Sequence, residues 1–286
     1  MKNNNIDIVK LMENINIKYT PEYFKELSKK QYKEDREYPE NFSNWYPHIK
    51  DFGQFKTTKV ISNQIFTWQE AEAFQETDNI DKVDWNLLNI ILKPTLNKME
   101  DNKLYNIKNG CFSNKFDFST CITDKEHLAE NLWKINYNSC MFDTGGYTEL
   151  VVRELIPYNK ETTLTIYNGM PLRNELRVFY NMDKNKIEYV VDYWDYEYCY
   201  PHIPDEDKEN FNNYFNSKDK DERLMYMVDY VYQYINTLKF DTTLKGIWSI
   251  DFMWCKDCKD NYDGIYLIDM ARGFRSAYWD KNKIKE

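Results

Sequence analysis

The chain has 286 residues, of which 42% are hydrophobic and 17% aromatic, and it carries a formal net charge of −9 at pH 7. This length and apolar content exclude a disordered chain and predict one large or two moderate folded domains. The acidic balance opposes non-specific binding to nucleic acid or to an anionic membrane. Because no apolar run approaches a membrane span and the amino terminus has no signal-peptide pattern, we expect a cytoplasmic protein.

The first hundred residues are predicted to be mainly helical. A threonine followed by proline at the start of residues 20–32 is typical of a helix N-terminus. Residues 67–70 form a capping box for a second helix. A third helix is predicted at residues 83–92, and Pro94 should kink or end it. We interpret residues 1–100 as a lobe that supports the site or faces the substrate.

From residue 102 the pattern changes to strands. Residues 103–108 form a short strand with Lys108 near its end, and a polar loop follows at 109–114. A second strand is predicted at 115–122, and a capping box at 123–126 begins a helix. A lysine at a strand end beside a tight loop suits triphosphate oxygens, because ammonium and loop amides complement dispersed negative charge.

The second strand begins with Lys115-Phe-Asp. This run is similar to the lysine motif of covalent nucleotidyltransferases, although Phe118 stands where that motif has glycine. An enzyme of that kind would form a lysyl-AMP adduct on Lys115.

The next strands carry a charged face. Residues 149–157 form a strand that ends at a proline, and residues 187–194 continue the same sheet. In the strand 174–180, period two places Glu175 and Arg177 on one face and apolar residues on the other. A charged face on a strand otherwise suited to a core indicates a cleft.

The last fifth of the chain is the most informative. After an amphipathic helix at 221–238, the apolar runs 246–254 and 264–273 predict an antiparallel hairpin. Asp251 and Asp269 lie in the middle of these runs. Two buried carboxylates on adjacent strands repel each other unless a cation lies between them, which predicts a magnesium site. The alternative is that each acid is salt-bridged to a structural arginine.

Together, the elements over residues 102–280 resemble the ATP-grasp fold. That family has a lysine-bearing strand, a hinge strand that cradles adenine, a basic residue facing the phosphates and a final hairpin with two acidic magnesium ligands. The runs Val-Val-Arg-Glu, Glu-Leu-Arg-Val-Phe and Leu-Ile-Asp look most like the divergent clade that includes the eukaryotic assembly protein for a translation initiation factor. In the family the last acid is usually glutamate and is followed two residues later by asparagine, here Ala271, which leaves the third metal ligand open.

The resemblance implies ATP and Mg²⁺ as cofactors and assigns a role to each matching residue. Catalytic roles fall to Lys108 and Arg177, and metal ligation to Asp251 and Asp269. The residues expected to bind ATP are Lys108, Lys115, Arg153, Glu154, Leu155, Ile156, Glu175 and Arg177.

The predicted fold class is α+β of ATP-grasp type, with two α/β lobes whose antiparallel sheets enclose a nucleotide cleft. We expect a helical lobe over residues 1–100, a small lobe over 101–150 and a large lobe with the metal-binding hairpin over 151–286. Such a protein would activate a carboxylate as an acyl phosphate for attack by an amine. The sequence does not identify these two substrates, and a peptide or protein is one candidate. The alternative is an ATP-binding assembly factor or chaperone that clamps a protein partner with little turnover.

Six cysteines are expected to be reduced thiols, namely Cys111, Cys121, Cys140, Cys199, Cys255 and Cys258. The last two have the spacing of a zinc knuckle, and Cys199 with His202 offers a second half-site. A lone pair of this kind is weak evidence for zinc, so the role of Cys255 and Cys258 stays open.

Overall fold

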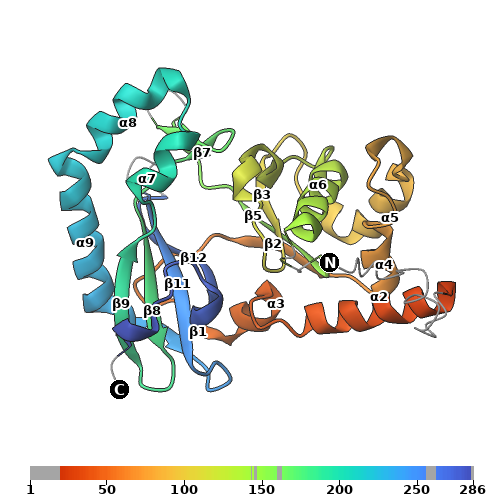
Figure 1. Ribbon diagram of the computed structural model, residues 1–286, viewed down its shortest axis with the longest axis horizontal. Coiled ribbons are helices and arrows are strands. Elements are labelled where there is room, and N and C mark those ends of the chain that lie inside the picture. Colours follow the sequence, from red (N-terminus) through yellow and green to blue (C-terminus); the bar gives the residue numbers. More distant parts are fainter. Residues whose placement is uncertain (1–19, 143, 145–146, 160–162, 256–261, 285–286) are drawn as a thin grey trace, which may run out of the picture.

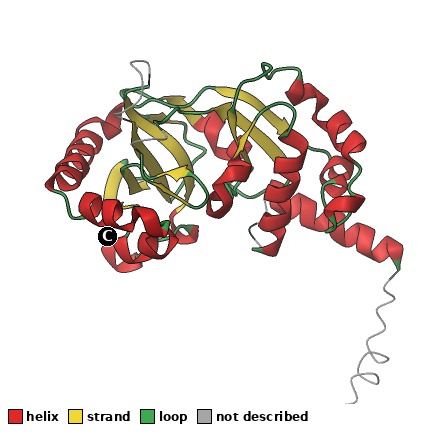
Figure 2. Ribbon diagram, turned by 90° about the horizontal axis from the view of Figure 1, so that it is seen from above, coloured by secondary structure: helices red, strands yellow, loops and turns green. Residues whose placement is uncertain are grey.

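The computed structural model describes residues 20–142, 144, 147–159, 163–255 and 262–284. These residues form a mixed α+β structure around two four-stranded antiparallel sheets, with helices on the outer sides of both (Figures 1 and 2). The α-helices are α2 (Pro21–Arg36), α3 (Phe42–Trp45), α4 (Trp68–Ala73), α5 (Trp85–Leu96), α6 (Leu128–Met141), α7 (Tyr196–Cys199), α8 (Lys208–Phe215) and α9 (Lys218–Tyr234).

The longest strands are the last two, with nine residues each. The strands are β1 (Ile49–Asp51), β2 (Val60–Ile65), β3 (Tyr105–Asn109), β4 (Ile122–Thr123), β5 (Glu149–Glu154), β6 (Thr165–Ile166), β7 (Met170–Pro171), β8 (Glu175–Asn181), β9 (Lys186–Asp192), β10 (Lys239–Phe240), β11 (Ile247–Cys255) and β12 (Gly264–Arg272). Short 3-10 helices lie at Tyr46–His48, Ile80–Lys82, Lys115–Cys121, Tyr200–His202, Asp205–Asp207, Ile235–Thr237, Gly273–Arg275 and Lys281–Lys283.

The first sheet has the strand order β2-β5-β3-β4. Helices α4, α5 and α6 contribute to the apolar core on one side of it, where Leu92 and Leu132 pack with Ile107 and Val152 of the strands. All four of these side chains are fully buried. Alternation along β3 turns the neighbouring Lys108 to the opposite side, which faces the second sheet.

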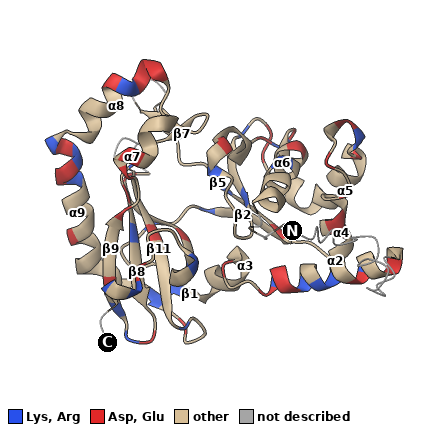
Figure 3. Cartoon of the chain, viewed as in Figure 1, with Lys and Arg blue, Asp and Glu red and all other residues tan. Residues whose placement is uncertain are grey.

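The second sheet has the order β12-β11-β8-β9. Its apolar face packs against α9, where Val231 meets Val178 of β8 and Ile250 of β11. The other face carries the charged residues of β8 and β11, and Figure 3 marks acidic and basic positions along these strands. Residues two apart share a face of a strand, so one sheet presents an apolar side and a charged side.

A connector at residues 56–59 joins the two sheets. The Lys56 amide donates to Ile265 O and the Leu267 amide donates to Lys56 O, both at 2.9 Å, so the connector pairs with β12. At its other end the Glu154 amide donates to Lys59 O at 2.8 Å, next to β5. The edges of the two sheets are thus held together by backbone hydrogen bonds.

A third apolar cluster lies around the β6–β7 hairpin, α7 and α8. The turn of this hairpin contacts the 3-10 helix Lys115–Cys121, where the Phe118 amide donates to Tyr167 O at 3.1 Å. Asn168 Nδ2 also donates to Asp117 Oδ1 at 3.2 Å. These contacts fix the helix that begins with Lys115.

The strand expected at residues 115–122 is wrong, because most of it is the 3-10 helix. Asn114 is buried with a left-handed φ of 44°, which turns the chain out of an extended path. Its Nδ2 donates to Thr120 Oγ1 at 2.8 Å, and Thr120 Oγ1 donates to Asp117 O at 2.7 Å. Asparagine tolerates this conformation and forms such local bonds, which compete with strand pairing.

The capping box expected at 123–126 is also wrong. Helix α6 begins at Leu128, and its N-cap has no side-chain hydrogen bond. Asp124 Oδ1 instead accepts the backbone amides of Glu126 and His127, at 3.0 and 2.9 Å, which closes a turn before the helix. Asp124, rather than Thr123, therefore accepts the backbone amides that precede the helix.

Pro94 does not end its helix, because α5 continues to Leu96. Proline leaves the carbonyl of Ile90 without a helical partner. Ile90 is 69% exposed, so this part of the helix faces solvent, where water can satisfy the carbonyl.

The other expected elements are confirmed as helices and strands. Thr20 caps α2 through a 3.2 Å bond from the Tyr23 amide, and residues 67–70 form the capping box of α4. The hairpin β11–β12 pairs antiparallel, with Asp251 opposite Asp269. Strand β2 was not expected. It pairs with β5. The domain boundary proposed between residues 150 and 151 falls inside β5, and the division into domains stays a prediction.

Cys255, the last residue of β11, is disulfide-bonded, so the expectation of a reduced thiol is wrong there. Cys111, Cys121, Cys140 and Cys199 are free thiols, as expected. Cys258 lies outside the described residues. In the described parts of the chain, no helix combines the length and apolar character needed to cross a membrane.

Candidate functional site

A cavity of about 180 Å³ lies beside the segment that follows β5, with walls from both sheets. Every predicted site residue lines it except Lys108 and Arg177, which pair with acids in its wall. The predicted residues in the wall are Lys115, Arg153, Glu154, Leu155, Ile156, Glu175, Asp251 and Asp269. The structure thus brings all of the predicted site residues together, while their roles stay predictions.

Arg177 and Asp251 form a bidentate ion pair on neighbouring strands of the second sheet. Nε and Nη2 donate to Oδ1 and Oδ2, each at 2.8 Å, and both side chains are 9% exposed. The pairing follows from the β8–β11 register, which places the two residues opposite each other. Burial alone would lower the pKa of Arg177, but the charge and hydrogen bonds of Asp251 raise it above its ordinary value.

Lys108 of the first sheet forms an ion pair with Asp269 of the second. Its Nζ donates to both carboxylate oxygens at 2.9 Å. The lysine side chain is only 2% exposed, whereas that of Asp269 is 34% exposed. The cation expected to face phosphates and the acid expected to bind metal therefore neutralise each other here.

Magnesium ligation requires carboxylate oxygens that are open to the metal. Both oxygens of Asp251 accept from Arg177, and both oxygens of Asp269 accept from Lys108. Within the described residues, no three His, Cys, Asp or Glu side chains gather as a metal ligand set. The arrangement therefore does not fit Mg²⁺ unless an ion pair breaks, and ligation by Asp251 and Asp269 stays a prediction. The sequence also allowed the alternative that each acid is salt-bridged to an arginine. Asp251 has such a partner in Arg177, whereas the partner of Asp269 is a lysine.

The side of the cavity formed by residues 153–156 is apolar on one wall and basic on another. Leu155 and Ile156 line it together with Met253 and Ile268. Arg153 crosses between the sheets, where its Nη1 donates to Ile268 O at 2.8 Å. Burial lowers the pKa of Arg153, and the charge of Asp269 offsets part of this effect. Such walls suit a flat, largely apolar ring with an anionic group attached.

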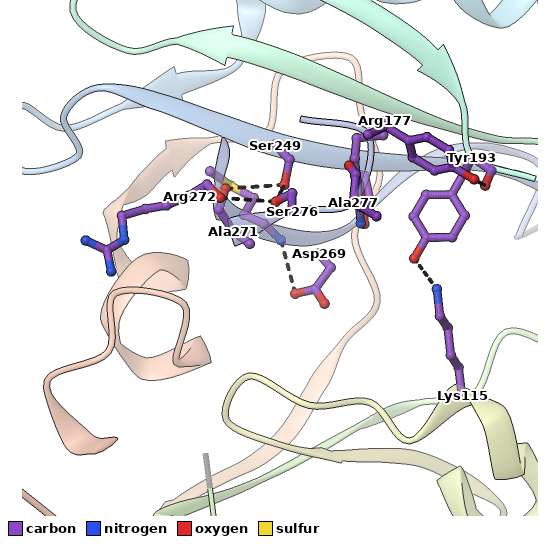
Figure 4. A network of polar contacts seen from close by, with 12 residues as sticks. Lys115, Arg177, Tyr193, Ser249, Asp269, Ala271, Arg272, Ser276 and Ala277 are labelled. Atoms are coloured by element: carbon purple, nitrogen blue, oxygen red, sulfur yellow. Dashed lines mark hydrogen bonds and ion pairs between the residues drawn. The ribbon is translucent and has the colours of Figure 1, made fainter. Parts of the chain in front are cut away.

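Lys115 enters the cavity from the 3-10 helix, and Tyr193, just after β9, is its partner (Figure 4). Its Nζ donates to the Tyr193 hydroxyl. The same nitrogen lies 4.3 Å from the centroid of the Tyr193 ring and 5.2 Å from that of Trp194. Burial lowers the pKa of Lys115, and the negative charges of Glu175 and Asp251 raise it in part.

Glu175 is a buried carboxylate that faces the cavity. Burial raises the pKa of Glu175 to about 7, while the charge of Lys115 and the indole N–H of Trp194 lower it in part. The cavity therefore contains an acid that titrates near neutral pH.

Tyr193 and Trp194 also line the cavity, and neither was predicted as a site residue. Both were expected to be part of a strand over residues 187–194, whereas β9 ends at Asp192. Two adjacent aromatic residues at the end of a strand, next to a charged face, were the available signal. Aromatic rings beside buried cations are common because the ring face attracts positive charge.

Comparison with known proteins adds little to this geometry. No family model matches the sequence, and no curated protein matches it. A D-alanyl-alanine synthetase A from Vibrio cholerae aligns with 76% of this chain at 12% identity and a TM-score of 0.26. The chain covers 50% of that synthetase's length. Chains that superpose at this TM-score need not share a fold, so the ATP-grasp resemblance continues to rest on residue order and local motif.

Proposed function

We propose that this protein is an ATP-dependent ligase of ATP-grasp type, which activates a carboxylate as an acyl phosphate for attack by an amine. The observation that supports it is the composition of one cavity. The apolar residues Leu155 and Ile156 line one side of it, in the segment 153–156 that matches the family's hinge, and Lys115, Asp251 and Asp269 line it as well. ATP likewise combines a largely apolar adenine ring with a charged triphosphate.

In this proposal the adenine lies against the hinge, and the phosphates extend toward Lys108, Lys115 and Arg177. Phosphoryl transfer is accelerated mainly by positioning and by positive charge at the transferring group. A carboxylate oxygen of the substrate bonds to the γ-phosphorus as the bond to ADP breaks. The amine then bonds to the acyl carbon, and phosphate leaves. A bound Mg²⁺ would add further positive charge at the phosphates.

A second candidate is an ATP-binding assembly factor with little turnover, as in the clade that the short motifs resemble. The observation that favours it is the pairing of Asp251 with Arg177 and of Asp269 with Lys108. With Ala271 at the position of the family asparagine, the chain offers few open metal ligands. Nucleotide binding without efficient phosphoryl transfer would follow.

Calorimetry with ATP, with and without magnesium, tests the part that both candidates share. We expect saturable binding of one ATP per chain, and no binding at millimolar ATP would remove the proposal. ATP consumption then separates the candidates. Consumption that rises when a carboxylate and an amine are supplied favours the ligase, whereas ATP-stabilised binding of a protein partner without consumption favours the assembly factor.

A further inference from the structure

Tyr193 contacts two cations that come from different parts of the fold. Lys115 belongs to the 3-10 helix, and its Nζ donates to the Tyr193 hydroxyl. Arg177 belongs to β8, and its Cζ lies 4.6 Å from the centroid of the Tyr193 ring. Figure 4 shows the ring between the two side chains, with its hydroxyl toward Lys115.

The backbone of Tyr193 is also fixed at both of its polar atoms. Its amide donates to Glu175 O at 3.0 Å, which continues the pairing of β9 with β8. Its carbonyl accepts from the Tyr278 hydroxyl at 3.2 Å. A side chain on such an anchored backbone has few alternative positions, so its hydroxyl is a stable acceptor.

Burial raises the pKa of the Tyr193 hydroxyl well above its usual value, so this group is neutral at physiological pH. A neutral hydroxyl orients an ammonium group without cancelling its charge, whereas a carboxylate partner neutralises it. Lys108 and Arg177 both have carboxylate partners. Lys115 instead contacts the Tyr193 hydroxyl and two aromatic rings. A bound phosphate would favour its charged form against the burial that lowers its pKa.

We propose that Tyr193 is a positioning residue that holds Lys115 and Arg177 at a fixed spacing for the phosphate groups of a nucleotide. The inference rests on the proposed function for the identity of the anion. The hydroxyl orients Lys115, and the ring face stabilises Arg177 by a cation–π contact. The acids that face this pair are Glu175, Asp251 and Asp269. Only Asp251 is hydrogen-bonded to either cation.

A substitution series separates the hydroxyl from the ring. Tyr193→Phe removes the hydroxyl and keeps the ring, whereas Tyr193→Leu removes both. Tyr232→Phe is the matched control, because that tyrosine is 54% exposed on α9. The first readout is the acetylation rate of Lys115 by acetic anhydride in the ligand-free protein, followed by peptide mass spectrometry. The second is ATP affinity by calorimetry.

In Tyr193→Phe we expect Lys115 to be acetylated about tenfold faster and ATP to bind about tenfold more weakly, as for loss of one hydrogen bond to a charged group. Tyr193→Leu should weaken ATP binding further, because Arg177 then loses its contact. The Tyr232→Phe control should match the wild type. In a Lys115→Gln background, Tyr193→Phe should have no further effect on ATP affinity.

The inference is overturned if Tyr193→Phe leaves both the acetylation rate and the ATP affinity at wild-type values. It is also overturned if the effect on ATP affinity persists in the Lys115→Gln background. If the wild type fails to bind ATP, the proposed function falls. The acetylation rate alone then decides whether Tyr193 holds Lys115.

Discussion

Lys108 and Asp269 form an ion pair that joins the two sheets across 161 residues of sequence. The lysine lies on β3 and the aspartate on β12. The lysine side chain is almost wholly buried, and the carboxylate that its ammonium contacts comes from the other sheet. The contact between the sheets and the state of the candidate site are therefore coupled.

Asp269→Asn should destabilise the ligand-free protein by about 2 kcal/mol, because it leaves a buried ammonium without its counter-ion. It should also weaken magnesium-dependent ATP binding if Asp269 turns to the metal. Thermal and urea melts of the ligand-free protein measure the first effect. If the variant is as stable as the wild type or more stable, repulsion between Asp251 and Asp269 outweighs the ion pair.

The matched control for the lysine of this pair is Lys103→Ala. Lys103 pairs with Glu100 at 2.9 Å, but the two side chains are 40% and 70% exposed. An exposed pair contributes little because solvent screens it, so this variant should melt close to the wild type. Lys108→Ala should melt well below both.

Arg177→Ala should lower the free energy of unfolding by about 3–5 kcal/mol, because Asp251 is then a buried carboxylate without a partner. The resemblance assigned Arg177 a role at the phosphates and gave it no structural partner. The register places Asp251 opposite Arg177, which explains the difference. Chemical denaturation measures the change.

Arg177→Lys keeps the charge and loses the two-pronged fork, so we expect a smaller loss of stability and a clear loss of ATP affinity. The double variant Arg177→Met/Asp251→Leu replaces the ion pair with apolar groups. Its stability should recover toward that of the wild type, while ATP binding should not. Recovery of neither property would mean that packing, rather than charge, dominates at this position.

Glu175 should make stability depend on pH. Its pKa is raised from 4.5 to about 7, so the folded state binds the proton more tightly than the unfolded state does. The folded state is therefore favoured at low pH, and this advantage is lost as the pH rises from 4.5 to about 7. Above that range the buried carboxylate costs up to about 3 kcal/mol.

Glu175→Gln should remove this cost. We expect the variant to be more stable than the wild type at pH 8 and close to it at pH 4, as measured by urea unfolding at both values. Glu197→Gln, on the surface helix α7, is a control that should show no such difference. A Glu175→Gln variant that is equally destabilised at both pH values would indicate that the carboxylate has a structural partner.

ATP with magnesium should raise the melting temperature, because a ligand that binds only the folded state stabilises it by mass action. Ile156→Trp should abolish this shift. Ile156 is 7% exposed in the cavity wall, and an indole there would fill the space beside Leu155. Ile156→Val is the control that should keep the shift. An unchanged shift in Ile156→Trp would place the nucleotide outside this cavity.

The long amphipathic elements and the final hairpin could be predicted from sequence because their patterns are local. Helix α9 and the strands β8, β11 and β12 each show their period within a few residues. The short strand β2 shows no such period, because its burial is set by β5, to which it pairs across nearly ninety residues. Local pattern alone does not contain that pairing.

The members of the candidate site could be named from sequence, but their partners could not. Placing Asp251 and Asp269 on adjacent strands followed from the hairpin, and their register confirms it. The cations that pair with them come from β8 and β3, and the second of these lies on the other sheet. Tyr193 was missed because its role depends on two residues distant in the chain.

The charged face of the second sheet also has a consequence for how the chain folds. Ile250 and Phe252, on either side of Asp251, are fully buried in the apolar cluster beneath α9. A slip of β11 by one residue would exchange the two faces of the strand and drive Asp251 into that cluster. It would also separate the Arg177 guanidinium from its counter-ion, Asp251. Misaligned hairpins are therefore several kcal/mol less stable, and the ion pair selects one strand alignment as the sheet assembles.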